Sequence, residues 1–163
     1  MEKSHEICFA AERTLGKLAK WLRILGFNTI YEPEVSRSRF IDSWENGRIL
    51  LTRTKLIYQN RHKSHQLIFI KSNNPFEQLK EVIKLLKLNR SDAKPFSRCI
   101  RCNTLINETD KDSIRGKVPD YIWETNDIFQ ICSGCQRIYW SGSHTKNSKE
   151  IIKKVFELCN NNN

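Results

Sequence analysis

Short apolar runs alternate with longer amphipathic stretches in the first part of the chain. Apolar runs predict buried strands at residues 7–11, 28–32, 48–52 and 66–70. Apolar positions at helical spacing predict helices at residues 13–26, 37–46 and 74–88. The basic stretch 53–65 is interpreted as helical or looped. Because strands that alternate with helices form parallel sheets covered on both faces, the pattern predicts an α/β fold with three layers, α/β/α.

The first predicted helix has two distinct faces. Its apolar stripe consists of Leu15, Leu18, Leu22 and Leu25. The basic residues on the opposite stripe, or at its edge, are Arg13, Lys17, Lys20 and Arg23. If the leucines pack against a sheet, the basic side chains face solvent. Gly26 is a typical helix stop.

The polar segment NRSDAKP, residues 89–95, marks a predicted domain boundary. The expected units are an α/β domain at 1–92, a cysteine-rich module at 93–147, and a C-terminal helix with a frayed tail at 148–163. Apolar residues recur along the last helix, so we expect it to pack back on the first domain.

The charge of the chain is positive and unevenly spread. The 163 residues carry a formal net charge of +10. Residues 1–94 hold 18 Lys and Arg against 10 Asp and Glu, whereas residues 95–163 hold 10 against 8. Such a field attracts polyanions, which favours nucleic acid as a partner, although the surplus also serves solubility. No apolar run approaches the roughly 20 residues that span a bilayer, and no signal-peptide pattern is present, so we expect a cytoplasmic location without a membrane partner.

Four of the six cysteines form two C-x-x-C pairs separated by 29 residues. The pairs are Cys99 with Cys102, and Cys132 with Cys135. Each pair can form a knuckle turn, and two knuckles supply the four thiolates that structural zinc prefers. In a reducing compartment this spacing indicates metal rather than disulfides, and zinc would contribute folding free energy to a module with little apolar core. Cys8 and Cys159 are interpreted as buried small apolar residues.

Several strings together resemble one family. They are FAAERTLGKLAKWLRILGFNTIY, GRILLTRT, PFEQLKEV, RCIRCN and FQICSGCQRIYWSGSH. In this order they resemble the Mut-seven C-terminal RNase domain family over roughly residues 7–145. The resemblance implies a PIN-like nuclease fold with an appended zinc ribbon, and a metal-dependent ribonuclease that hydrolyses phosphodiester bonds. In PIN-type catalysis, clustered carboxylates hold Mg²⁺ or Mn²⁺ at the carboxyl ends of parallel strands, and no small-molecule cofactor is expected.

The resemblance places the candidate catalytic positions at Glu12, Glu34, Asp42 and Thr54. Glu12 stands where the family has an Asp after the first strand, and Thr54 stands where it has the Asp of its LLTRD motif. Serines and arginines occupy residues 36–39, where the family is rich in acids. Losing a carboxylate weakens both cation affinity and charge compensation. Three functions stay open: an active ribonuclease, a catalytically reduced RNA-binding protein, and an interaction module in a ribonucleoprotein.

Basic residues are expected beside the strand ends, where α/β sheets bind ligands. The predicted RNA-binding set is Arg13, Lys17, Lys20, Arg23, Arg53, Lys55 and Arg101. Tyr139 and Trp140 follow the second knuckle and either pack the small core of this module or stack on unpaired bases. His144 is either a structural histidine or a contact to phosphate or base. No side chain is assigned to base readout.

Overall fold

The computed structural model describes residues 6–55 and 66–160, and its central element is a four-stranded sheet. The strands are β1 (Cys8–Ala11), β2 (Asn28–Tyr31), β3 (Ile49–Thr52) and β4 (Leu67–Phe69), in the spatial order β2-β1-β3-β4. Every neighbouring pair is parallel. The predicted strands and their parallel arrangement are confirmed. Most of the basic stretch 53–65, from residue 56 onward, lies outside the described residues.

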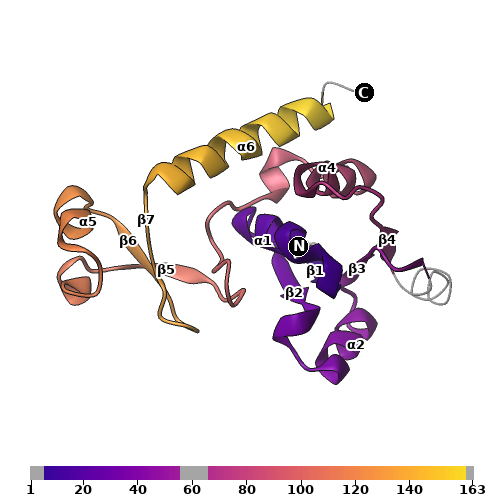
Figure 1. Cartoon of the computed structure of the whole chain (residues 1–163), viewed down its shortest axis with the longest axis horizontal. Helices are drawn as coiled ribbons and strands as arrows, with labels where there is room; N and C mark the ends of the chain where they lie inside the picture. Colours follow the sequence, from indigo (N-terminus) through magenta and orange to yellow (C-terminus); the bar gives the residue numbers. More distant parts are fainter. Residues whose placement is uncertain (1–5, 56–65, 161–163) are drawn as a thin grey trace, which may run out of the picture.

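Helices cover both faces of this sheet (Figure 1). One face carries α1 (Gly16–Ile24), α4 (Pro75–Leu85) and α6 (Ser143–Asn160), and the other carries α2 (Arg37–Glu45). Successive side chains of a strand point to opposite faces. Phe9 and Leu51 therefore join the cluster beneath α1, α4 and α6. Ala10 and Leu50 pack with Phe40 of α2. The predicted α/β/α layering is confirmed.

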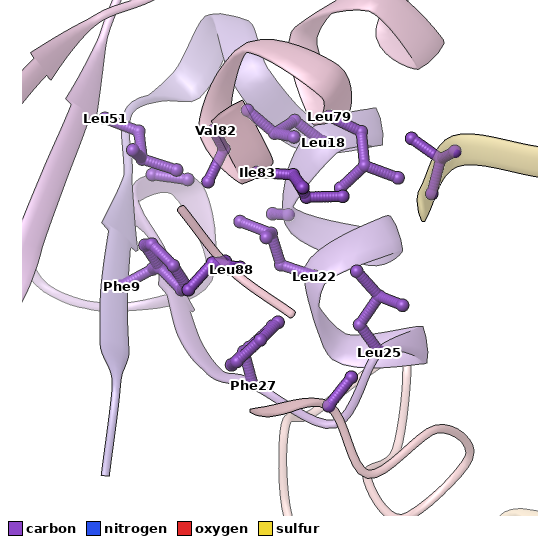
Figure 2. Close-up of a cluster of buried hydrophobic side chains, with 14 of the residues drawn as sticks. Phe9, Leu18, Leu22, Leu25, Phe27, Leu51, Leu79, Val82, Ile83 and Leu88 are labelled. Atoms are coloured by element: carbon purple, nitrogen blue, oxygen red, sulfur yellow. The ribbon is translucent and has the colours of Figure 1, made fainter. Parts of the chain in front are cut away.

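The leucine stripe predicted between residues 13 and 26 is buried (Figure 2). Its four members are each at most 1% exposed, and they begin in a 3₁₀ turn (Arg13–Leu15) that precedes α1. Leu79, Val82 and Ile83 of α4 belong to the same cluster. Full burial of such a side chain contributes about 1.5–3 kcal/mol, so the stripe holds α1 firmly on the sheet.

Two helices differ from prediction at their ends. α4 begins behind the predicted cap, where the Asn74 side chain accepts hydrogen bonds from the backbone N–H groups of residues 76 and 77, but it ends at Leu85 instead of 88. α6 begins at Ser143, whereas the predicted start was residue 148. The prediction missed the first turns of this helix because they are polar and carry no apolar stripe. Its later turns bury Val155, Phe156 and Cys159 in the main core, and the burial of Cys159 was predicted. This packing confirms that α6 packs back on the first domain.

A three-stranded antiparallel sheet follows the linker and forms the ribbon. Its strands are β5 (Ile106–Thr109), β6 (Phe129–Cys132) and β7 (Ile138–Trp140), with the short helix α5 (Asp120–Thr125) between β5 and β6. Tyr139 packs on a cluster with Cys99, and Trp140 packs on a separate cluster with Phe129. The packing role considered for these two aromatics is therefore present. The proposed boundary between residues 92 and 93 stays a prediction.

None of the helices within residues 6–55 and 66–160 has the length and apolar character needed to cross a membrane.

Candidate functional site

The two C-x-x-C pairs adopt the same turn. In each pair the backbone N–H of the second cysteine donates to the sulfur of the first, over 3.4 Å from Cys102 to Cys99 and 3.4 Å from Cys135 to Cys132. A residue in the left-handed region follows each pair: Asn103 with φ 69° and Gln136 with φ 58°. The repeated geometry is the knuckle turn that the spacing predicted.

The four sulfur atoms converge. All of them lie within 4.8 Å of one another, with 3.6 Å between Cys99 and Cys135 and 3.3 Å between Cys102 and Cys132. Thiolates bound to one tetrahedral zinc ion, at about 2.3 Å each, would stand roughly 3.8 Å apart. The four cysteines can therefore hold a metal ion, and four protein ligands leave no open position for catalysis.

Close approach of the knuckles depends on Gly134. A Cβ at this position would lie 2.6 Å from Thr104 Oγ1 and 3.3 Å from Cys102 Sγ.

Burial raises the pKa of the Cys102 thiol, but hydrogen bonds from Thr104 and the neighbouring cysteines outweigh it and lower the pKa to about 6. The thiolate is the form that binds metal. The Tyr139 hydroxyl lies 3.0 Å from Cys99 Sγ and joins β7 to the first knuckle.

Arg23 corrects the predicted basic face. The sequence placed this residue at the edge of a solvent-facing stripe, but Arg23 is only 2% exposed. Its guanidinium donates hydrogen bonds to the carbonyl oxygens of Thr29 (3.0 Å), Ile100 (3.0 Å) and Arg101 (3.1 Å), and to the carboxylate of Glu34 (2.6 Å). The carbonyls of residues 100 and 101 belong to the first knuckle, which covers this part of α1. Arg23 is thus committed to protein groups, and the prediction that it faces solvent on the basic stripe is wrong.

The first knuckle also covers the outer edge of β2. The Asn103 side chain accepts a hydrogen bond from the Thr29 N–H over 2.9 Å, and Arg98 donates to the Gly26 carbonyl over 3.1 Å. Gly26 has φ +90°, and a Cβ there would lie 2.2 Å from the carbonyl oxygen of Lys94. Uncovered strand edges pair with other chains, so this contact protects the sheet as well as joining the two units.

Glu12 lies where the sequence predicted it, at the carboxyl ends of β1 and β3. It is 2% exposed, and its carboxylate accepts hydrogen bonds from Thr14 Oγ1 (2.5 Å), Thr52 Oγ1 (2.6 Å) and the Arg53 N–H (2.9 Å). Burial raises the pKa of Glu12, but these bonds and one from the Thr54 side chain outweigh it and hold the pKa below its ordinary value. The carboxylate is therefore ionised, and protein donors stabilise its charge.

The other predicted acids do not join Glu12. Glu34 pairs with Arg23, and Asp42 lines a shallow hollow with Cys8 and Arg48, where β1 and β3 begin. Within the described part of the chain, the four cysteines are the only group of three or more metal-binding side chains close enough to hold an ion. The carboxylate cluster that the resemblance implies for Mg²⁺ or Mn²⁺ is thus not assembled there.

Glu32 is an acid at this edge that the sequence reasoning missed. Its carboxylate accepts a hydrogen bond from the Arg13 N–H over 2.9 Å and lies 3.7 Å from the Arg13 guanidinium. Parallel pairing sets Ala11 beside Tyr31, so the residues that follow them come off neighbouring strand ends. A signal was available, because the predicted strand 28–32 ends on this glutamate.

The remaining basic residues lie on or just before α1 and at the end of β3. We call the surface that they form the α1 surface. Its members are Arg13, Lys17, Lys20, Arg53 and Lys55. All are exposed except Arg53, which is half-buried. Lys17 and Lys20 form no ion pair with any residue the structure describes. Arg53 donates to the Asn73 side chain, and its buried Nε has no described partner. Arg101 is exposed on the first knuckle, outside this surface.

The fold and the cysteine centre together define a class: an α/β domain with a parallel sheet, joined to a four-cysteine ribbon. The family model of the Mut7-C RNAse domain matches residues 7–152. The chain therefore belongs to the Mut7-C RNAse domain family, as its motifs predicted. Membership indicates a nuclease-like function with RNA as substrate or partner. Neither the search of curated proteins nor the search of solved structures gave a match.

Proposed function

We propose that the chain is an RNA-binding protein with a reduced nuclease centre, and that RNA lies along the α1 surface. The hydrogen bonding of Glu12 is the observation that supports this most. Both oxygens of the carboxylate accept hydrogen bonds from protein donors, so the group is already stabilised without a cation. Thr54, which replaces the family's aspartate, adds a hydroxyl in place of the second negative charge.

The α1 surface supplies what an RNA backbone needs. Lys17 and Lys20 project from consecutive turns of α1, and the Arg13 side chain is 73% exposed beside the end of β1. Cations that contact phosphates release bound counterions, and this release drives much of the affinity for nucleic acids. The carboxylates of Glu12 and Glu32 at this edge already accept hydrogen bonds from protein donors, which reduces their repulsion of an approaching phosphate.

Metal-dependent cleavage of RNA is the rival function. Family membership favours it, and so does the ionised state of Glu12, since an ionised carboxylate can ligate Mg²⁺ or Mn²⁺. In this case Glu12 would hold the ion and Thr54 would orient water or substrate. The incomplete carboxylate set weighs against it.

One assay separates the two functions. End-labelled single-stranded RNA is incubated with Mn²⁺ and either the wild-type protein or the Glu12→Gln variant, and binding and products are followed in the same samples. We expect both proteins to bind the RNA and to leave it intact. Products that wild type forms and Glu12→Gln does not form would establish the enzyme and overturn the reduced centre.

We further propose that the ion in the cysteine centre is structural zinc. Four thiolates with sulfur separations of 3.3 and 3.6 Å support this identity. Elemental analysis is expected to give about one zinc per chain in wild type and in the Cys8→Ser control, and none in Cys99→Ser/Cys102→Ser. A different metal, or zinc retained by the double variant, would contradict the assignment.

A further inference from the structure

A cavity of about 500 Å³ lies between the ribbon sheet, the end of α1 and the first turns of α6. Figure 1 shows α6 running from β7 across to α4 over this part of the molecule. The apolar lining includes Ile24, Phe96, Ile100, Ile106, Tyr139 and Trp140. Ile24 is the last residue of α1, whereas Glu12 precedes the first turn of that helix. The cavity is therefore distinct from the edge that carries Glu12.

The polar groups of this cavity divide into two sets. Arg98 and Thr145 are committed, because Arg98 donates to Glu6 and to backbone carbonyls and Thr145 donates to the Trp140 carbonyl. A second set makes no side-chain hydrogen bond or ion pair with any part of the chain that the structure describes. Its members are Gln130, Ser141, His144, Ser148 and Lys149. The cavity thus pairs an apolar wall with free donors and acceptors.

The charge of the lining is of one sign. Arg98 and Lys149 are cationic, and no Asp or Glu among the residues that the structure describes lines the cavity. Lys149 Nζ lies 6.0 Å from the centre of the Phe96 ring, so the ammonium sits beside the aromatic wall. A ligand that fits this arrangement has a flat apolar part next to a negative group.

The aromatic walls are held in place before a ligand arrives. Tyr139 is tied to the first knuckle through its hydroxyl and Cys99 Sγ, and Trp140 packs against the ribbon cluster around Phe129. Rigid walls reduce the entropy that binding would otherwise lose.

We propose that this cavity binds one nucleotide of a single-stranded RNA, with the base against Tyr139, Trp140 and Phe96 and the phosphate near Lys149 and His144. The choice of ligand rests on the proposed RNA function, but the site is a separate one. A nucleobase has apolar faces and a hydrogen-bonding edge, which match the wall and the free Gln130 amide. An aliphatic ligand would match the apolar wall but would use none of these polar groups.

The test uses the zinc-loaded full chain and adenosine 5′-monophosphate as the probe. The indole N–H signal of Trp140, assigned with the Trp140→Phe variant, is followed by NMR during the titration. We expect the nucleotide to shift this signal, and inorganic phosphate at the same concentration to leave it in place. Lys149→Glu is expected to weaken nucleotide binding about tenfold, because it reverses the charge that meets the phosphate. Lys146→Glu makes the same charge change on the same helix but outside the lining. This variant is the matched control and should bind the nucleotide as wild type does.

A second variant guards against misfolding as an explanation. Ser148→Phe fills the cavity from an accessible position on α6, so it should keep the melting temperature of wild type and lose the nucleotide shift. Absence of a shift with wild type, equal weakening by Lys146→Glu, or a shift produced equally by an acidic peptide would overturn the proposal. Variants of Lys17 and Lys20 should leave this titration unchanged. The experiments therefore distinguish an error in the proposed RNA binding along the α1 surface from an error in the proposed nucleotide binding in the cavity.

Discussion

Replacing Arg23 with Met removes the guanidinium that joins α1 to the first knuckle and keeps most of the aliphatic stem. Three carbonyl acceptors lose their donor, at residues 29, 100 and 101. Each such hydrogen bond contributes about 1 kcal/mol. The ion pair with Glu34 adds little, because the Glu34 side chain is 36% exposed and water screens the charge. We therefore expect the free energy of unfolding to fall by about 3 kcal/mol, which lowers the melting temperature of a chain this size by roughly 6–12 °C.

The measurement is urea unfolding of the zinc-loaded protein, with Arg13→Met as the matched control. The Arg13 side chain is 73% exposed and lies 3.7 Å from its partner, so its loss should change stability by less than about 0.5 kcal/mol. Arg23→Met is also expected to weaken zinc retention against a chelator, because the first knuckle loses part of its support. If both variants unfold at the same urea concentration, the junction does not stabilise the molecule and this reasoning is wrong.

Three further outcomes are expected. Because hydrogen bonds hold the pKa of Glu12 below its ordinary value of 4.5, its stabilising contribution is present above that pH and is lost as the pH falls through the lowered value. As the pH falls through this range, the Glu12→Gln variant should therefore lose less stability than wild type. Parallel curves of stability against pH for the two proteins would contradict this prediction. Gly134→Ala should weaken zinc affinity, measured by chelator competition, because the added Cβ would lie 2.6 Å from Thr104 Oγ1; unchanged affinity would show that the knuckles can separate. Thr54→Asp should tighten Mn²⁺ binding, measured by calorimetry, because it adds a carboxylate beside Glu12. Thr54→Asn is the uncharged control, and equal heats from both variants would contradict a cation site at residue 54.

The parallel sheet and its layers could be predicted because the information is local. Each strand is a short apolar run, and the leucine stripe of α1 recurs at helical spacing, so the alternation leads directly to the α/β/α arrangement. The cysteine centre could also be predicted, since two C-x-x-C pairs define their own turn and need only be brought together.

Arg23 could not be predicted correctly because its environment is set from outside the helix. Helical spacing shows which face of α1 lies opposite the leucines, but only the docked knuckle, more than seventy residues away along the chain, shows that part of this face is covered. The polar first turns of α6 were missed for a similar reason, because they line a cavity and bury no apolar stripe.

The salt dependence of RNA binding tests the proposed function most directly. Affinity for a labelled single-stranded RNA is measured by fluorescence anisotropy across a series of salt concentrations. The proteins compared are wild type, Lys17→Glu/Lys20→Glu, and a control with the same charge change on exposed lysines elsewhere, Lys84→Glu/Lys117→Glu. The proposal predicts a linear fall of log affinity with log salt, and a slope for the α1 double variant that is shallower by about 0.7 for each phosphate that the variant no longer neutralises, with the control close to wild type. Affinity that is insensitive to salt, or equal weakening by both double variants, would contradict RNA binding along α1.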